Sequence, residues 1–551
     1  MRPRTSIRRI LFLRPFRPPN SPRLFTHNTL IPKSRPQLPF LSSPNRRPIA
    51  RFLTTETKQW IKDEVLFAGK FTAALWTGTF LLLVMAFGVQ QEWLERKFPS
   101  PHEWSWVTRK DYRSARWAVD RDENGDERAD WALTGDFYRL LLKRLEDPNI
   151  DGAGLKDELE GGILVAGVGK TGFDISMKSE PWRRGYYEVI MGAAKAAERL
   201  DGCVQDKTRH IVFPANVVIG PSNPDPRPVP PGAASPPREE DCVPAFEPPE
   251  TYYVRALTTQ GFTQKQRVNA AMAYASWLDY KKSPDAAFEM YKWAVDIARS
   301  NSVGADPEID STTGVLNPNV RAPSANLVSA ATALAVHHAL NNNVSQALPI
   351  FISILRARRS LQDVPTTMRS TLIPDDENDG ILKAVTSFVR SIIVPPAYPS
   401  PPDDGTAAPL RGPKERCEEA GIMTYIGEIL YASKPSGTSR EDGLAWTREA
   451  VDLAEEELRR KGIDNDAKKT CKQCLEVGLG NWMTMVTKMA KQEKEAKAGK
   501  VGSWLGIGSE QKDAIGRWES EEQVIKERMR RAEEILASPV RSAGASSFLN
   551  I

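Results

Sequence analysis

The most apolar stretch of the chain runs from Phe71 to Val89 and contains 19 residues with neither a charge nor a proline. As a helix it would cover roughly 28 Å, which is close to the hydrocarbon thickness of a bilayer. Lys70 and Trp93 lie near its two ends, and such side chains suit a membrane interface. The pattern predicts a membrane-spanning helix over 71–89, with a buried core helix as the alternative. No later stretch is comparably apolar, so we expect a single-pass protein.

Beyond this stretch, apolar residues recur with the period of amphipathic helices. The three strongest patterns are Trp104–Asp120, Trp131–Glu146 and Glu180–Leu200. Residues 203–248 break the helical pattern, because the proline-rich run 221–232 cannot form a helix. We expect this part of the chain to be an exposed loop.

Short runs of β-forming residues flank the third helix at Ile163–Val168 and His210–Ile219. We expect these two runs to pair as a small hairpin-like insert. A second proline-rich loop is expected at Val394–Pro413.

Two later segments share a pattern of small and large residues at positions i, i+4 and i+7, which lie on one face of a helix. The residues are Ala287, Tyr291 and Ala294 in one segment and Ala347, Phe351 and Ile354 in the other. A further alanine, Ala275 or Ala335, stands twelve residues before each segment. This is the pattern of the tetratricopeptide (TPR) unit, in which small residues let two helices approach and an aromatic fills the remaining gap. A plain bundle of alanine-rich helices is the alternative.

Two degenerate units follow. The first pairs Ala420–Ser433 with Arg440–Leu458, where Gly443, Thr447 and Ala450 take the positions of the second helix. Pro435–Ser439 lengthen the turn of this unit. The second unit pairs Cys474–Ala490, around Gly478 and Trp482, with Glu519–Leu536 after a glycine-rich loop at Gly499–Gly508.

The first 53 residues contain 12 Lys and Arg and no Asp or Glu. An Arg-rich, acid-free segment is typical of a mitochondrial transit peptide, which the membrane potential draws toward the matrix. Arg51-Phe52-Leu53 fits the cleavage pattern of the matrix protease, so the mature chain is expected to begin near Thr54. A disordered basic arm that binds nucleic acid is the alternative.

Removal of this segment lowers the count of Lys and Arg from 75 to 63 and leaves 70 Asp and Glu, so the net charge changes from +5 to −7. A mildly acidic mature protein has no electrostatic reason to bind nucleic acid. The charges that flank the apolar stretch are balanced and do not set its orientation. Because a presequence enters the matrix first and the apolar stretch then stops transfer, we expect the C-terminal domain in the intermembrane space.

The patterns together predict an all-α fold, a TPR-like α-solenoid of helix pairs behind a single N-terminal transmembrane helix, with proline-rich loop insertions. The expected organisation is a transit peptide at 1–53, a short matrix segment at 54–70, the transmembrane helix at 71–89, a helical N-terminal region with a long loop at 90–248, TPR-like repeats at 249–393, a proline-rich loop at 394–413, degenerate TPR-like helices at 414–540 and a disordered tail at 541–551.

Five cysteines are too few for a disulfide scaffold; they are Cys203, Cys242, Cys417, Cys471 and Cys474. Cys471 and Cys474 are one helical turn apart, so a local redox bridge is one interpretation and incidental cysteines are the other. Cys203 and Cys242 bracket the long loop and would staple it in an oxidising compartment.

The segment Ala166–Gly172 (AGVGKTG) resembles a phosphate-binding loop, but Leu164 stands where that motif requires its first glycine. A glycine-rich turn is therefore the favoured interpretation. With five His in the chain, no catalytic triad, paired carboxylates or metal-ligand spacing is evident. His338, beside His337, takes a packing position that TPR units usually give to an aromatic. We predict a non-enzymatic protein with no cofactor, no metal and no small-molecule substrate.

A TPR array binds its partners on the concave face that the first helix of each unit forms. The register places Asn269, Met272, Ser276 and Asp279 on that face in the first unit, and Ser329, Thr332, Val336 and Ala339 in the second. TPR domains that clamp a C-terminal carboxylate need Lys, Arg and Asn there, a set that neither unit supplies. The groove is expected to be neutral to apolar and to suit an unfolded segment or a partner helix. Alternatively, Met272 and Val336 pack against neighbouring repeats.

The leader, the single proline-free span, the segment Gln90–Trp104 (QQEWLERKFPSPHEW) directly after it and the degenerate TPR units together resemble one fungal family. It is the TPR-containing adaptor subunit of the mitochondrial i-AAA protease complex in the inner membrane. The resemblance implies a protein that binds i-AAA protease subunits and recruits misfolded or unfolded client proteins for degradation. It supplies no catalytic residues and no role for Gly161–Gly172.

Two other hypotheses fit the same sequence features. One is a TPR scaffold or assembly factor for a respiratory-chain or protein-import complex, which would have a stable stoichiometric partner. The other is a nucleotide-dependent enzyme that relies on Lys170.

Overall fold

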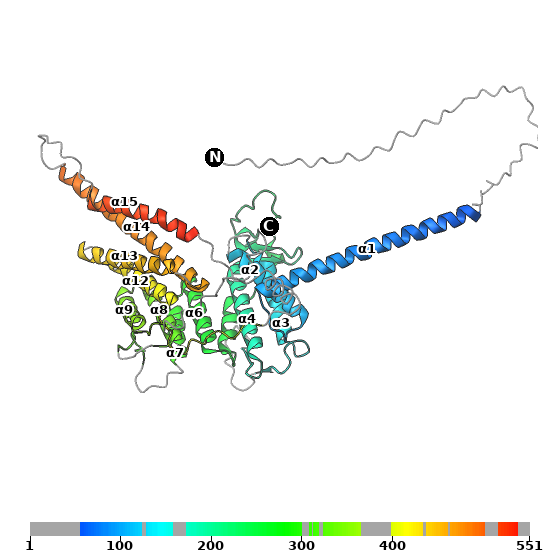
Figure 1. Cartoon of the computed structure of the whole chain (residues 1–551), viewed down its shortest axis with the longest axis horizontal. Helices are drawn as coiled ribbons and strands as arrows, with labels where there is room; N and C mark the ends of the chain where they lie inside the picture. The colour runs from blue at the N-terminus through cyan, green and yellow to red at the C-terminus, as the bar shows by residue number, and fades with distance from the viewer. Residues whose placement is uncertain are drawn as a thin grey trace, which may run out of the picture. The chain divides into compact units, whose positions relative to one another are not determined.

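The structure is a computed structural model that describes residues 55–123, 128–157, 172–299, 308–310, 312–318, 323–364, 398–433, 437–460, 463–501 and 516–537. These residues form a mostly helical protein with thirteen α-helices and a few short strands (Figure 1). The chain divides into two compact units, Met1–Met85 and Ala86–Ile551. The predicted transit peptide, the Ile163–Val168 run and Lys170 lie outside the described residues.

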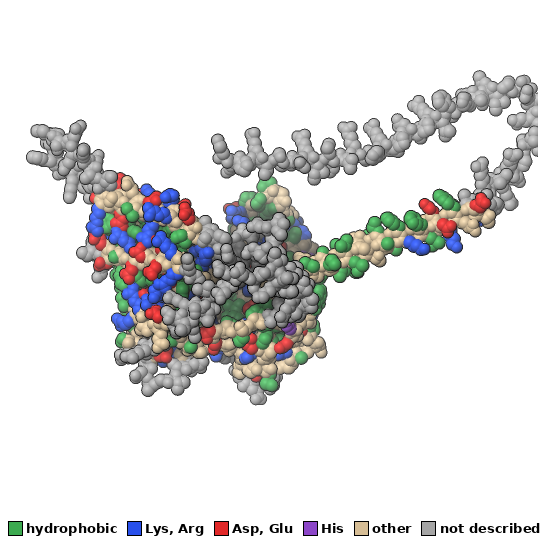
Figure 2. All heavy atoms as spheres, viewed as in Figure 1, with side chains coloured by type: hydrophobic (Ala, Val, Ile, Leu, Met, Phe, Trp, Pro, Cys, Tyr) green, Lys and Arg blue, Asp and Glu red, His purple; other side chains and the backbone are tan. Residues whose placement is uncertain are grey.

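Helix α1 spans Thr55–Lys97 and is longer at both ends than the predicted span. Its apolar side chains are exposed along its length, while charged side chains gather near its N-terminal end (Figure 2). The hydroxyls of Thr72 and Thr77 donate to the carbonyls of Ala68 and Ala73 at 2.7 and 2.8 Å, so these polar groups are satisfied inside the helix. By length and composition, α1 is able to cross a membrane.

Four helices follow the end of α1: α2 (Trp106–Glu123), α3 (Trp131–Glu146), α4 (Glu180–Leu200) and α5 (Pro249–Thr258). The first three match the amphipathic patterns in the sequence. Their core is aromatic, because Trp182 and Tyr186 of α4 are fully buried together with Tyr138 of α3. Helix α4 approaches its neighbours closely at two glycines: a Cβ on Gly185 would lie 2.6 Å from Trp104, and one on Gly192 would lie 2.3 Å from Tyr138.

Residues 203–248, which were predicted to form an exposed loop, contain three short strands. Strand β3 (Cys203–Asp206) lies between β4 (Val212–Pro214) and β5 (Cys242–Pro244) in an antiparallel sheet. Strand β4, which lies within the predicted run 210–219, pairs with β3. The other predicted run, 163–168, lies outside the described residues, so its pairing with 210–219 stays a prediction. A separate two-stranded ladder joins β1 (Lys156–Asp157) to β2 (Phe173–Asp174).

The remaining helices form four hairpins in chain order (Figure 1). They are α6 (Gln264–Tyr280) with α7 (Pro284–Arg299), α8 (Ala325–Leu340) with α9 (Val344–Arg359), α12 (Pro413–Ser433) with α13 (Gly437–Arg459), and α14 (Asn465–Val501) with α15 (Arg517–Ala537). Helix α14 extends well beyond the predicted Cys474–Ala490 in both directions. It remains helical into the start of the predicted glycine-rich loop, whose residues after Val501 lie outside the described part.

The first two hairpins turn in the same way. Lys282 and Asn342 occupy equivalent turn positions and both adopt a left-handed conformation, with φ of 59° and 60°. The N–H of Lys282 donates to the carbonyl of Asp279, and the N–H of Asn342 donates to the carbonyl of Ala339. The eight predicted packing residues are all buried: Ala275, Ala287, Tyr291, Ala294, Ala335, Ala347, Phe351 and Ile354.

The third hairpin is built on a close glycine contact. A Cβ on Gly443 of α13 would lie 2.5 Å from the carbonyl oxygen of Gly427 on α12, so the two backbones touch. Thr447 and Ala450, predicted to lie on the same face as Gly443, are buried. The sequence therefore identified the packed face of α13 correctly.

The described part of the second proline-rich loop, residues 398–412, is extended and runs across the N-terminal ends of other helices. We call it the strap. Arg184 of α4 donates to the carbonyls of Pro399 and Ser400 at 2.6 and 3.1 Å. The N–H of Asn326, in the first turn of α8, donates to the carbonyl of Gly405 at 3.0 Å. The strap thus connects α4 with α8.

Candidate functional site

The predicted groove residues lie on α6 and α8, which are in contact with each other. Three of them are exposed: Asn269, Ser276 and Ser329. Four are partly buried: Met272, Thr332, Val336 and Ala339. Met272 and Val336 pack against the hydrophobic core, which was the alternative left open by the sequence, yet both retain an exposed edge.

Asp279 has a different role from the one predicted. Its carboxylate oxygens both lie 2.9 Å from Nδ1 of the buried His337 on α8. The ring of Tyr291 on α7 lies 5.1 Å from the ring of His337. Burial, followed by the nearby charge of Asp279, raises the pKa of Tyr291, so this hydroxyl stays protonated. Asp279 therefore joins the first hairpin to the second and is occupied by that contact.

Two exposed side chains were missed by sequence reasoning. Tyr280 and Leu340 are the last residues of α6 and α8, and their exposed fractions are 75% and 72%. Each stands five residues after the first packing alanine of its hairpin, Ala275 or Ala335. The spacing of the two predicted units therefore indicates that Tyr280 and Leu340 occupy equivalent positions. Each also lies one helical turn after a predicted groove residue, Ser276 or Val336.

We define the A-helix face as the row that these residues form on α6 and α8: Asn269, Met272, Ser276, Tyr280, Ser329, Thr332, Val336 and Leu340. None of the eight carries a charge, and two of the exposed members, Tyr280 and Leu340, are large and mainly apolar. Such a surface favours apolar side chains of a partner over a carboxylate or a phosphate.

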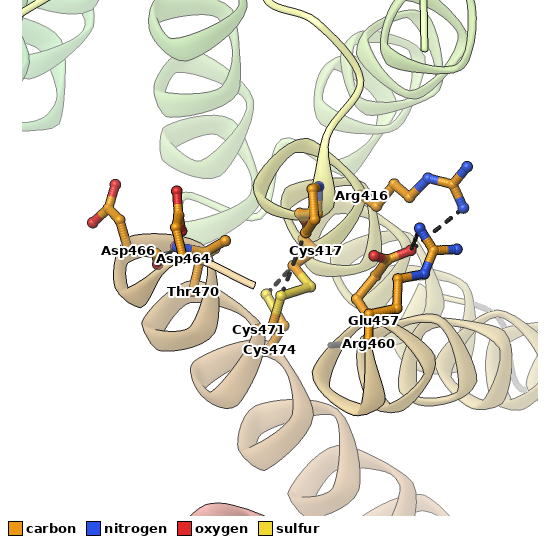
Figure 3. The surroundings of a disulfide bond; sticks show 11 residues. Arg416, Cys417, Glu457, Arg460, Asp464, Asp466, Thr470, Cys471 and Cys474 are labelled. Carbon is orange, nitrogen blue, oxygen red and sulfur yellow. Dashed lines mark hydrogen bonds and ion pairs between the residues drawn. A yellow bond between two sulfur atoms is a disulfide. The ribbon is translucent and has the colours of Figure 1, made fainter. Parts of the chain in front are cut away.

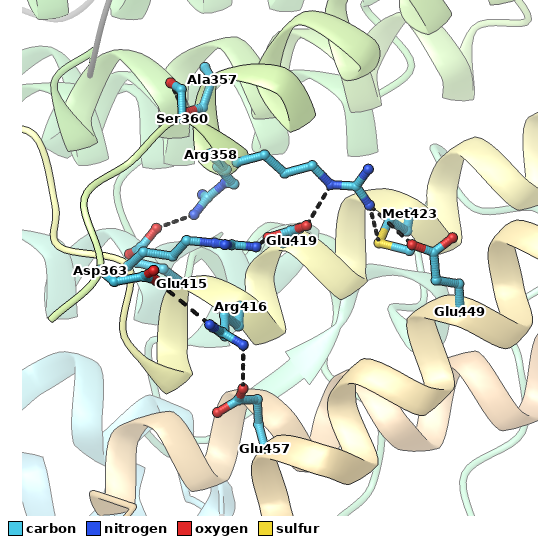
Figure 4. Close-up of polar contacts among 12 residues, drawn as sticks. Ala357, Arg358, Ser360, Asp363, Glu415, Arg416, Glu419, Met423, Glu449 and Glu457 are labelled. Atoms are coloured by element: carbon cyan, nitrogen blue, oxygen red, sulfur yellow. Dashed lines mark hydrogen bonds and ion pairs between the residues drawn. The ribbon is translucent and has the colours of Figure 1, made fainter.

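A partly buried ionic network joins the second hairpin to the third (Figure 4). Arg358 and Arg359 of α9 pair with carboxylates of α12, with Nε of Arg359 lying 2.7 Å from Glu419. Arg411 reaches the other oxygen of Glu419 at 2.9 Å. Glu419 is almost completely buried, so its charge depends on these two guanidinium groups. The network fixes α9 against α12.

A disulfide between Cys417 and Cys471 joins α12 to α14 (Figure 3). The Cα atoms are 5.0 Å apart and both side chains are fully buried. The local bridge between Cys471 and Cys474, one of the two interpretations of the sequence, does not form, because Cys471 is bonded to Cys417 of the neighbouring hairpin. Cys474 is a free thiol that donates to the carbonyl of Cys417 at 3.0 Å. Burial raises the pKa of Cys474 to about 11, so it is not a nucleophilic thiolate at neutral pH.

The staple predicted between Cys203 and Cys242 is also absent, and both are free thiols. The sheet register explains this, since Cys242 lies opposite Asp206 and not opposite Cys203. Cys242 is thus displaced along the sheet by three residues from the position opposite Cys203. This offset corresponds to about 10 Å, which is too far for a disulfide.

Of the glycine-rich segment Gly161–Gly172, the structure describes only Gly172, whose N–H donates to the hydroxyl of Thr258 at 2.9 Å. No group of three or more potential metal ligands occurs among the described residues. Comparisons with known proteins gave no match to a family, to a curated protein or to a solved structure. The described residues thus define a mostly helical protein with four helical hairpins and one long apolar helix.

Proposed function

We propose that this protein is a non-enzymatic TPR-like adaptor that α1 anchors in the mitochondrial inner membrane. Its A-helix face binds unfolded or misfolded client proteins, and the protein delivers them to an i-AAA protease complex. The observation that carries the proposal is the uncharged A-helix face on two hairpins with equivalent turns and equivalent buried positions.

The TPR-like interpretation is supported by the match between the first two hairpins. Their packing alanines, their aromatic residues and their left-handed turn residues recur at the same spacing. Repeats of this kind stack in one dimension and present the first helix of each unit along a continuous face.

The character of this face supports a protein ligand. The exposed rings and chains of Tyr280 and Leu340 offer apolar contact, and the hydroxyl and amide groups between them offer hydrogen bonds. An unfolded segment or an amphipathic helix presents both kinds of group, and helix-in-groove recognition uses them together.

The buried disulfide supports placement of the hairpins in the intermembrane space. Disulfides persist in oxidising compartments and are rare where thiols are kept reduced. Cys417 and Cys471 are bonded inside the packed core of the third and fourth hairpins, and this fits a domain that folds outside the matrix. The acid-free leader supports a mitochondrial address.

Affinity purification of the tagged full-length protein in mild detergent tests the proposal. We expect subunits of a membrane-anchored AAA protease together with many client proteins in small amounts. The double variant Tyr280→Ser, Leu340→Ser should lose the clients, because it replaces the two apolar side chains of the face with small polar ones. Met177→Ser is the matched control, since Met177 is 81% exposed and lies outside the hairpins.

Two results would contradict the proposal. Absence of an AAA protease from the purified material would remove the adaptor role. Recovery of a single respiratory or import complex in fixed stoichiometry would instead favour the scaffold or assembly factor.

A further inference from the structure

Large apolar side chains are exposed where α1 meets α2. The exposed fractions are 43% for Phe87, 45% for Trp93, 56% for Trp106 and 40% for Val107. Trp106 and Val107 form the first turn of α2, and the hydrophobic core of the helical domain lies elsewhere. Contiguous exposed apolar patches on soluble proteins commonly mark sites that bind a protein or a membrane.

Trp106 of α2 lies beside the end of the apolar stretch of α1. Its ring lies 6.2 Å from the ring of Phe87, in an edge-to-face contact. Phe87 belongs to the apolar stretch 71–89, two residues before its end. Trp93, about two turns further along α1, instead contacts Trp117 of α2 at 5.0 Å. The N-terminal turn of α2 therefore lies beside the last turn of the apolar stretch.

The turn that carries Trp106 is held firmly. The N–H of Ser105 donates to the buried carboxylate of Asp151 at 2.8 Å, and the hydroxyl of Thr108 donates to the same group at 2.6 Å. Arg144 of α3 donates to Thr108 and to Ser105 at 2.9 and 3.0 Å. Because these contacts fix both sides of the first turn, Trp106 cannot fold back into the core without breaking them.

The connection between α1 and α2 is also fixed. Glu95 of α1 is buried and accepts hydrogen bonds from the N–H and the hydroxyl of Ser100 at 3.0 and 2.9 Å. Arg109 and Arg113 of α2 pair with the same carboxylate. An ionic cluster of this kind sets the direction of α2 relative to the last turns of α1.

We infer that the first turn of α2 inserts into the interfacial zone of the lipid bilayer that α1 enters. Trp106 and Val107 then form a second membrane contact beside the helix, with Phe87 and Trp93 completing an aromatic collar. The lipid surface is the occupant because Trp106 contacts Phe87, which belongs to the apolar stretch 71–89, and tryptophan favours the boundary between hydrocarbon and water. This inference rests on the membrane anchoring in the proposed function.

Site-specific photo-crosslinking tests the inference on the full-length chain. The protein is reconstituted into phosphatidylcholine vesicles that contain a fraction of phosphatidylcholine with an alkyne-tagged acyl chain. The variant Trp106→p-benzoylphenylalanine keeps an aromatic ring at an exposed position, so the fold should be retained. Phe80→p-benzoylphenylalanine reports on the apolar stretch of α1, and Met177→p-benzoylphenylalanine reports on an exposed position away from the collar.

We expect lipid adducts from positions 80 and 106 and at least tenfold fewer from position 177. Adducts at 80 without adducts at 106 would overturn the inference and leave the membrane anchor in place. Equal yields at 106 and 177 would also overturn it, because the contact would then be non-specific. Absence of adducts at position 80 would refute the anchor itself, and with it this inference.

Discussion

Replacing Gly443 with alanine should destabilise the protein, although alanine is the better helix former. A Cβ at this position would lie 2.5 Å from the carbonyl oxygen of Gly427 and 2.7 Å from the amide nitrogen of Tyr431. Both neighbours are backbone atoms, so no side chain can rotate away and α12 and α13 must move apart. Such overpacking costs about 1–3 kcal/mol, whereas the gain in helix propensity is about 1 kcal/mol. Taking the upper end of the overpacking cost, we expect the free energy of unfolding to fall by about 2 kcal/mol.

Gly480 provides the matched control. It lies in the middle of α14, is exposed, and has no atom within 4 Å of a Cβ placed on it. Gly480→Ala should therefore stabilise the protein by roughly 0.5–1 kcal/mol, because only the propensity changes. The same chemical substitution thus has opposite signs at the two positions.

The assay is thermal unfolding of the full-length protein in detergent micelles, followed by tryptophan fluorescence and by far-UV circular dichroism. Gly443→Ala should lower the midpoint of the transition by a few degrees and Gly480→Ala should raise it slightly. If both variants raise the midpoint, α12 and α13 do not pack through their glycines, and the reasoning about the third hairpin fails.

Three further predictions concern the contacts between helices. Cys417→Ser should lower the free energy of unfolding by up to about 4 kcal/mol, because it removes a disulfide that closes a loop with a sequence separation of 54 residues. Cys474→Ser is the control and should leave the disulfide intact. Unfolding with and without reductant distinguishes the two variants, because reductant should destabilise only the protein that still has the disulfide. Burial lowers the pKa of His338 in the folded protein below its value in the unfolded chain. As the pH drops below about 6.5, the unfolded chain therefore binds a proton more readily than the folded protein does, and the free energy of unfolding should fall. His338→Phe should flatten this dependence, as midpoints recorded at several pH values would show, and an unchanged slope would contradict it. Glu419→Gln should lower the free energy of unfolding by about 2–3 kcal/mol, because it removes a buried carboxylate from its two guanidinium partners. The control is Glu449→Gln at an exposed position, which should change the unfolding midpoint by less than a degree. Equal shifts of the midpoint in both variants would refute the role of burial.

The sequence predicted well those features that depend on local periodicity. Helices α3 and α4 begin and end at the residues that the amphipathic patterns indicate, and the packing residues of the first two hairpins are buried as expected. This success has a physical reason, since the spacing of apolar residues on a helix directly determines which face is buried. Gly443 was placed on the correct face by the same reasoning.

Features that depend on contacts between distant residues were missed. Strands β3 and β5 have four and three residues and are separated by 35 positions, so neither produces a recognisable alternating pattern. The partner of Cys471 is 54 residues away on another hairpin, and no spacing rule identifies it. The ends of α1 and α14 were also missed, because charged residues interrupt or replace the apolar residues in their outer turns.

Contacts between elements link the helices that carry the proposed lipid contact to those that carry the proposed client face. Arg184 binds the strap on the side of α4, and Asn326 binds it at the start of α8, so the strap couples the N-terminal helices to the hairpin that carries half of the A-helix face. On the N-terminal side, Asp151 fixes the first turn of α2. Hydrogen bonds to Asp151 and to the strap therefore lie along the connection between the proposed lipid contact and the proposed client face. Groups that are ordered before binding reduce the entropy lost when a partner binds, which would favour the proposed binding of clients.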